Sequence, residues 1–209
     1  MMLKNTPPFL TAFAVAVVCG SGSPAAAQDR PLRTVKDGLL DEIKLYAEKL
    51  PSSGRIVIRS FSATDADIVE GEKKEETKTM QADGPRMLSE HFISKLKELK
   101  SFADVSALES AAAAPSDALL VEGKFTELDP GSRAKRYFGG FGAGKSAVTI
   151  VGSVKSTDGT VLATFQHRRI GTIGAFGGDS LGKLAADTKS LGEDVAKFVD
   201  AWATGKKLK

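Results

Sequence analysis

Cysteine and histidine are scarce in this chain, and their scarcity excludes several kinds of chemistry. Cys19 is the only cysteine, and it lies in an N-terminal segment that we expect to be removed. The remaining chain then has no disulfide, no cysteine nucleophile and no cysteine metal site. His91 and His167 are the only histidines, and they do not form a close ligand set such as H-x-x-x-H. We therefore expect neither a metal site nor a bound cofactor.

An excess of charge of one sign is also missing. The 29 lysine and arginine residues nearly balance 26 aspartate and glutamate residues, which leaves a formal net charge of +3. A general nucleic-acid binder normally has a strongly basic face, so we expect no nucleic-acid partner. Hydrophobic residues make up 42% of the chain and charged residues 26%, which is typical of a soluble globular domain.

The N-terminal segment has the three-part layout of a secretory signal peptide. Lys4 supplies a short positive region, residues 9–18 are apolar, and residues 20–27 are small and end in an A-x-A cleavage site. The apolar stretch is too short to span a bilayer as an anchor. The layout predicts cleavage after Ala27 and a periplasmic or secreted protein without a transmembrane span.

Lipid modification of Cys19 is the alternative interpretation of this segment. Bacterial lipoprotein signals usually have a small residue just before the cysteine and a leucine near the third position before it. Val18 and Ala16 stand at these positions here. We therefore prefer simple cleavage.

Residues 139–146 match the phosphate-loop pattern G-x-x-x-x-G-K-[ST] at every position. A phosphate loop requires a buried strand before the glycines and a helix after them. Residues 132–138 are basic where that strand should be, and residues 147–154 are β-branched and largely alternating, which predicts a strand rather than a helix. An exported protein would also have no access to ATP. We interpret the match as accidental and expect no nucleotide to bind.

Hydrophobic spacing predicts three helices and several strands. The first helix is expected over residues 34–50, with Thr34 as its cap, and residues 62–79 as a solvated loop. A second helix is expected from near Asp83, with Pro85 in its first turn. The other predicted elements are strands over residues 55–61, 102–105 and 118–128, and a final helix that begins at Asp179 or Ser180.

A β-hairpin is the clearest local prediction. Residues 148–155 and 160–166 are rich in β-formers and flank Asp158-Gly159, a strong signal for a two-residue turn. A turn centred there places Thr157 opposite Thr160. Counting outward gives the pairs Val154 with Ala163, Gly152 with Phe165, Ile150 with His167 and Val148 with Arg169. The apolar side chains then fall on one face, which supports this register.

These elements predict an α/β protein of the α+β type, with a single-layer mixed, largely antiparallel sheet packed against two to three helices. Residues 1–27 form the signal peptide and residues 28–33 a leader in this prediction. Residues 34–205 form one mixed α/β envelope domain, and residues 206–209 form a basic tail. The length suits a single core.

Residues 133–138, the glycine-rich run 139–146 and the turn at 157–162 carry a family resemblance. They resemble an exported bacterial family described as a domain of unknown function, numbered forty-four ten in that series, over roughly residues 51–203. The resemblance implies no ATPase and supplies no catalytic residues. More loosely, the order of elements is similar to the N-terminal domain of TolB and related envelope lipoproteins, which implies a partner-binding module.

One end of the sheet gathers the candidate binding residues. The loop that enters the first hairpin strand and the loop that leaves the second must share that end. Arginine there can pair with phosphate or carboxylate groups, and exposed phenylalanine can anchor a partner. The alternative is that the glycines serve only tight turns while the phenylalanines fold into the core. The predicted binding residues are Arg133, Lys135, Arg136, Phe141, Lys145, Arg168, Arg169 and Phe176.

These features favour a non-enzymatic module of the bacterial envelope that binds a protein or an anionic envelope component. The alternative function is an envelope hydrolase whose carboxylates come together only in the fold, because such pairs need not be close in sequence. A deep pocket with converging acidic groups would favour the enzyme, and a shallow surface would favour binding.

Overall fold

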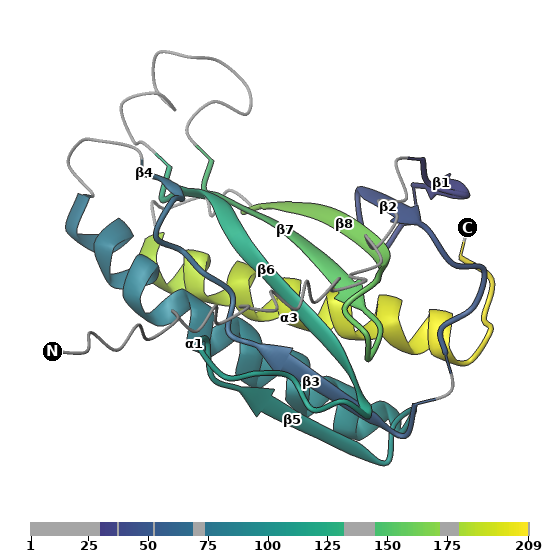
Figure 1. Ribbon diagram of the computed structural model, residues 1–209. Helices are drawn as coiled ribbons and strands as arrows, with labels where there is room; N and C mark the ends of the chain where they lie inside the picture. Colours follow the sequence, from purple (N-terminus) through teal and green to yellow (C-terminus); the bar gives the residue numbers. More distant parts are fainter. Residues whose placement is uncertain are drawn as a thin grey trace, which may run out of the picture.

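The computed structural model describes residues 30–36, 38–51, 53–68, 74–131, 145–171 and 180–208. One twisted sheet forms a layer, and two long helices lie side by side across one of its faces (Figure 1). This arrangement confirms the predicted fold class. Neither helix of the described chain is long and apolar enough to cross a membrane.

Strands and two helices follow one another along the described chain. The strands that precede the first helix are short, and the longest strands lie between the two helices. In chain order the elements are β1 (Arg33–Val35), β2 (Glu42–Leu45), β3 (Arg55–Arg59), β4 (Asp67–Ile68), α1 (Lys74–Leu99), β5 (Asp104–Leu108), β6 (Ala118–Asp129), β7 (Ala147–Lys155), β8 (Val161–Ile170) and α3 (Ser180–Ala203).

The strands form one sheet in the order β1-β2-β8-β7-β6-β3-β5, and β4 pairs with β6 beyond the end of β3. The pairs β1/β2, β2/β8, β8/β7 and β7/β6 are antiparallel. The pairs of β3 with β5 and β6, and of β4 with β6, are parallel. The sheet is therefore mixed and largely antiparallel, as predicted.

The core lies between the sheet and the two helices. Leu88 and Phe92 of α1 and Leu191 and Val195 of α3 are fully buried in it. A Cβ atom at Gly192 would lie 2.5 Å from the carbonyl oxygen of Leu88, so the helices approach through this glycine. A glycine inside a helix costs about 1 kcal/mol relative to alanine, and here the close helix contact gives that glycine a packing role.

The hairpin register is confirmed from Val154 outward. The ladder between β7 and β8 pairs Val154 with Ala163, Gly152 with Phe165, Ile150 with His167 and Val148 with Arg169. The strand predictions over residues 55–61 and 118–128 are likewise confirmed in β3 and β6.

The turn itself differs in one detail. Thr157 does not pair with Thr160, because the Thr160 carbonyl accepts a hydrogen bond from the Ser156 N–H (2.9 Å) in a loop one residue longer than predicted. Gly159 has a φ of 86°, a left-handed conformation that glycine adopts readily. A bulge next to Val154 takes up the extra residue and restores the predicted register.

The helix predicted over residues 34–50 is wrong. This segment forms β1 and β2, which extend the sheet by pairing β2 with β8. Ile43 and Leu45 are buried at alternate positions of β2, and Val35 is buried in β1. In a short segment the same apolar residues can fit both the helical and the strand spacing. The free edge of β8 decided between the two patterns.

The second helix is longer than predicted. It begins by Lys74, within the segment interpreted as a solvated loop, so Pro85 lies in its interior. Thr77, Met80 and Gly84 are buried at helical spacing and continue the stripe from Leu88 toward the N-terminus. The sequence pattern missed this extension because a threonine, Thr77, occupies one of its buried positions.

A glycine in each of two neighbouring strands makes room for a phenylalanine ring. Gly123 of β6 and Gly152 of β7 are paired across the ladder. A Cβ atom at Gly123 would lie 2.9 Å from a ring carbon of Phe61, and one at Gly152 would lie 2.8 Å from a ring carbon of Phe165. The two ring centroids are 6.5 Å apart. The rings therefore cover glycine backbone at the centre of the sheet.

We expect Gly152→Val to lower the free energy of unfolding by about 1–3 kcal/mol, the usual cost of overpacking a core. The new side chain would collide with the Phe165 ring and with the Glu122 carbonyl oxygen, 2.9 Å from the Cβ position. Urea denaturation measures the change. Gly38→Val is the control, because no atom lies within 4 Å of its Cβ position; it should shift stability by less than about 0.5 kcal/mol. Equal midpoints for both variants would contradict the packing described for Phe165.

Candidate functional site

The strand ends predicted to share one end of the sheet do so. The Gly171 N–H donates a hydrogen bond to the Ser146 carbonyl (2.8 Å), and Ala147 pairs with Ile170. The last residue of β6, Asp129, pairs with Ala147 at the same place. We call this the loop end of the sheet, defined by Asp129, Ser146, Ala147, Ile170 and Gly171.

Three of the eight predicted binding residues lie in the described chain. Lys145 precedes β7 at the loop end, and Arg168 and Arg169 lie near the end of β8. The remaining five lie outside the described residues: Arg133, Lys135, Arg136, Phe141 and Phe176.

Arg168 and Arg169 are not brought together, because successive residues of a strand face opposite sides of the sheet. Arg168 lies on the open face, where its guanidinium makes a two-pronged contact with Glu127 (2.8 Å for both bonds). The Thr149 hydroxyl also donates to Glu127 (2.6 Å). Hydrogen bonding from Arg168 holds the pKa of Glu127 below its usual range. The charge of Arg168 is therefore already compensated within the sheet.

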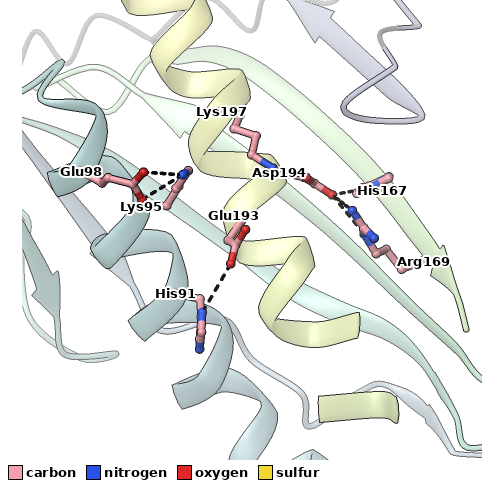
Figure 2. Close-up of polar contacts among 8 residues, drawn as sticks. All are labelled: His91, Lys95, Glu98, His167, Arg169, Glu193, Asp194 and Lys197. Atoms are coloured by element: carbon pink, nitrogen blue, oxygen red, sulfur yellow. Dashed lines mark hydrogen bonds and ion pairs between the residues drawn. The ribbon is translucent and has the colours of Figure 1, made fainter. Parts of the chain in front are cut away.

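Arg169 faces the helices and contributes to a polar cluster around the buried carboxylate of Asp194 on α3 (Figure 2). Its Nε donates to Oδ2 of Asp194 at 3.0 Å, and Nε2 of His167 lies 3.4 Å from the same oxygen. Lys197, one turn further along α3, donates to Oδ1 at 3.2 Å. The side chains of His167 and Asp194 are only 12% and 6% exposed.

Burial alone would raise the pKa of Asp194. Hydrogen bonds and charge from His167, Arg169 and Lys197 outweigh burial and lower the pKa to about 2. Asp187, two turns earlier on α3, shows the opposite balance, because burial raises its pKa against the charges of Arg169 and Lys183. Its Oδ2 is buried without a hydrogen-bond partner among the described residues. Two carboxylates of one helix therefore differ in their tendency to ionise.

Asp41 extends the cluster to the edge of the sheet. Its Oδ2 accepts a hydrogen bond from the Arg168 backbone N–H (2.6 Å) and lies 3.3 Å from Nδ1 of His167. The Arg168 N–H lies just beyond the last pair of the ladder between β2 and β8, so it has no partner in β2. The Asp41 carboxylate accepts the hydrogen bond in place of a strand carbonyl. The His167 ring thus lies between two carboxylates.

An exposed apolar side chain marks the loop end. Ile170 is 52% exposed, one of two large hydrophobic residues with this property in the described chain. Its cross-strand neighbour Ala147 is two residues from Lys145, and no described residue lies within ion-pair distance of that lysine. An isoleucine in water near an uncompensated cation is an arrangement that a partner could cover.

The open face of the sheet holds a broad, shallow hollow of about 1250 Å³. Its described carboxylates are ion-paired: Glu122 contacts Lys155 (2.5 Å) and Arg59, and Glu42 contacts Lys44 (2.9 Å). The rest of the lining is mixed: it includes hydroxyl and amide side chains such as Ser153, Thr164 and Gln166, and also apolar side chains and lysines. No group of three or more potential metal ligands is present among the described residues.

The segment after the phosphate-loop match is a strand. Ser146 is followed directly by β7, which pairs on both sides within the sheet. The helix N-terminus that would hold a phosphate is therefore missing at this position.

Sequence reasoning missed the partners of the basic strand end. Asp194, Glu127 and Asp41 were not singled out, because each meets its cation only through tertiary contact. One signal was available, however. The predicted register puts His167 and Arg169 on the same face as Phe165, so both had to meet the helix layer, where a carboxylate can accept hydrogen bonds from them.

Comparison with known proteins places the chain in a family. Residues 56–175 match the family described as Domain of unknown function (DUF4410). The match spans more than half of the chain, and the chain belongs to this family. No curated protein matches the sequence.

Solved structures resemble the fold only distantly. A PelC dodecamer from Paraburkholderia phytofirmans is 14% identical with a TM-score of 0.44, covering 73% of this chain and 92% of that chain. A point variant of that dodecamer is 13% identical with a TM-score of 0.43, covering 74% and 95%. An uncharacterized protein is 11% identical with a TM-score of 0.37, covering 72% and 95%.

Asp194→Asn should destabilise the protein by about 2 kcal/mol at neutral pH, because the pKa of Asp194 is about 2 in the folded state and about 3.9 in an unfolded chain. A lowered pKa stabilises the fold above about pH 4, and that contribution is lost as the pH falls toward about 2. The difference in unfolding free energy between wild type and variant should therefore shrink over this window. Denaturation from pH 7 to pH 2 measures it.

Glu98→Gln is the matched control, because it removes a carboxylate from the exposed pair with Lys95 on α1 (Figure 2). Surface pairs of this kind contribute less than about 1 kcal/mol. A pH-independent difference for Asp194→Asn, equal to that of Glu98→Gln, would contradict the role given to the buried cluster.

No ATP or GTP should bind the protein, with or without Mg²⁺, because a strand follows Ser146 where a phosphate loop needs a helix. Lys145→Ala should leave the unfolding midpoint nearly unchanged, since no described residue pairs with this lysine. Titration calorimetry checks the first statement and urea denaturation the second. Micromolar nucleotide binding that disappears in Lys145→Ala would restore the phosphate-loop interpretation.

Proposed function

We propose that this protein is a non-enzymatic binding module of the bacterial envelope, which presents the loop end of its sheet to a protein or an anionic envelope component. The signal-peptide layout of residues 1–27 supports export to the periplasm or beyond, by cleavage near Ala27 or as a lipoprotein through Cys19. The strand ends give the loop end a firm scaffold, because three of them are hydrogen-bonded there.

The exposed Ile170 carries the proposal. Its side chain is 52% exposed at the end of a strand whose inward-facing residues, such as Ala163 and Phe165, are buried. Binding surfaces combine such an apolar anchor with nearby charge, and Lys145 supplies a cation without a described ion-pair partner. The paired Arg168 would contribute less, because a ligand anion has to compete with Glu127 for its guanidinium.

Binding fits the described carboxylates better than hydrolysis does. The open hollow is shallow, and its carboxylates form ion pairs with lysine or arginine. Asp187 and Asp194 have pKa values shifted in opposite directions, as an acid and a base require. Three cationic or hydrogen-bonding side chains hold Asp194 beneath α3, however, and neither carboxylate lines a described hollow. The envelope hydrolase therefore remains the second candidate.

Affinity capture from envelope extracts tests the proposal, with the full chain as bait. The double variant Ile170→Asp with Lys145→Glu should lose at least about tenfold of the captured component, since removing an anchor residue and reversing a charge together cost more than about 1.4 kcal/mol. Quantitative mass spectrometry measures the loss. Ala103→Asp with Lys97→Glu is the control, because it makes the same change in net charge at two exposed residues, and Ala103 directly precedes β5 at the end of the sheet away from the loop end.

Equal recovery with both variants would contradict binding at the loop end. Failure to recover any component, together with hydrolysis of cell-wall or lipid substrates by the purified protein, would overturn the binding function and support the hydrolase. Substitution of Asp187 and Asp194 by asparagine would then be expected to abolish that hydrolysis.

A further inference from the structure

A second hollow lies at the other end of the sheet, between the β1/β2 hairpin and the C-terminal end of α3. Its volume is about 820 Å³, within the range of small-molecule sites. We call it the hairpin-end cleft. It is lined by Leu32, Arg33, Leu45, Ala47, Glu48, Lys49, Leu50, Trp202, Ala203, Thr204, Gly205, Lys206, Lys207 and Leu208.

Apolar and polar side chains line this cleft in about equal parts. Its apolar lining includes Leu45, Trp202 and Leu208, which belong to the main core and are less than a tenth exposed. The Trp202 ring stacks on Phe198 with centroids 6.0 Å apart, and its Nε1 donates to a backbone carbonyl of the facing segment at 3.4 Å. Leu32 borders the cleft and is 66% exposed. The apolar part of the lining thus runs from the edges of buried core residues to one exposed leucine.

The charges around the cleft are unbalanced. The charge of Lys206 is compensated by the buried carboxylate of Asp200, which lies 2.8 Å away and does not line the cleft. Arg33, Lys49 and Lys207 are exposed, and no described residue lies within ion-pair distance of any of them. Glu48 is the single carboxylate of the lining. The charged groups that are left uncompensated therefore favour an anion.

We propose that the hairpin-end cleft binds a single-chain amphiphile with an anionic head, of the free fatty acid class. The acyl chain would lie against Leu32, Leu50 and Trp202, where it removes apolar surface from water. The carboxylate would be held by Lys49 and Lys207, which gain a charge-assisted contact they lack within the described protein. A bilayer surface fits less well, because most of the apolar wall is recessed and only Leu32 projects.

Trp202 provides a direct readout, because it is the only tryptophan of the chain and lines the cleft. The full chain is titrated with a conjugated polyene fatty acid that accepts energy from excited tryptophan. We expect saturable energy transfer from Trp202 at micromolar ligand, and displacement of the probe by palmitate. The uncharged alcohol of the same chain length should displace it at least about fivefold less effectively, since it lacks the contact with the lysines.

Charge reversal tests the head-group contact. Lys49→Glu with Lys207→Glu should weaken probe binding about tenfold, because two exposed ion pairs are replaced by repulsion. Lys97→Glu with Lys124→Glu makes the same change in net charge on α1 and on the open face, and should leave binding unchanged. Urea midpoints of all variants should confirm that the fold is retained, since these four lysines are exposed and carry no described ion pair.

Several results would overturn this proposal. One is an absence of saturable transfer from Trp202. Equal binding of palmitate and the alcohol, or an equal effect of the two lysine pairs, would show that the cations do not hold the carboxylate head. Energy transfer only to probes in phosphatidylglycerol vesicles, with none to monomeric fatty acid, would assign the surface to a membrane. The result of this test does not depend on the loop-end proposal, because that proposal is tested separately by partner capture with the Ile170 variant.

Discussion

The antiparallel pairing of β7 with β8 determines where nearly every functional candidate in this protein lies. In a strand, successive side chains face opposite sides, so a register shift of one residue would exchange the two sets. The observed register places Ala163, Phe165, His167 and Arg169 toward the helices and Arg168 toward the open face. Two adjacent arginines of the sequence therefore serve different surfaces.

This register also creates an electrostatic requirement beneath α3. A carboxylate that enters the interior loses its hydration, and the fold compensates by placing cations and hydrogen-bond donors beside it. Arg169 and His167 of β8 meet that requirement for Asp194, and Lys197 completes the contact from the same helix. The polar cluster thus connects the final helix to the last strand, two elements that are neighbours in sequence but are otherwise joined by apolar packing.

Covering only one face of the sheet shapes what the protein can do. The helices approach closely through Gly192, and paired glycines in β6 and β7 let two phenylalanine rings lie against the backbone. No helix of the described chain covers the opposite face, where Glu122 and Glu127 are engaged in ion pairs. A deep pocket with free carboxylates does not arise among the described residues, so the sites we propose lie at the two ends of the sheet. The loop end offers an isoleucine near a lysine, and the hairpin end offers a cleft of mixed polarity bordered by cations.

Most of the strands, the final helix and the hairpin register could be predicted from the sequence, because each follows from local patterns. Val148, Ile150 and Val154 alternate on one strand, and Asp158-Gly159 limits where the chain can reverse. The strand after Ser146 was likewise predictable from its β-branched residues. The same local reasoning failed for residues 34–50, where helical and strand spacings coexist and the free edge of β8 decides between them. It failed again at the start of α1, where Thr77 is buried without being recognisably apolar.

The ion pairs and the composition of the two sheet ends depend on tertiary packing and could not be predicted from local patterns. Glu127 with Arg168 and Asp194 with Arg169 join residues more than twenty positions apart, and many other carboxylates in the chain have the same local surroundings. The hairpin-end cleft likewise forms from residues near both ends of the described chain, which a sequence pattern cannot bring together. Local periodicity determines which way a side chain points within its own element. Which group it meets there depends on how the elements pack, and that is a property of the whole chain.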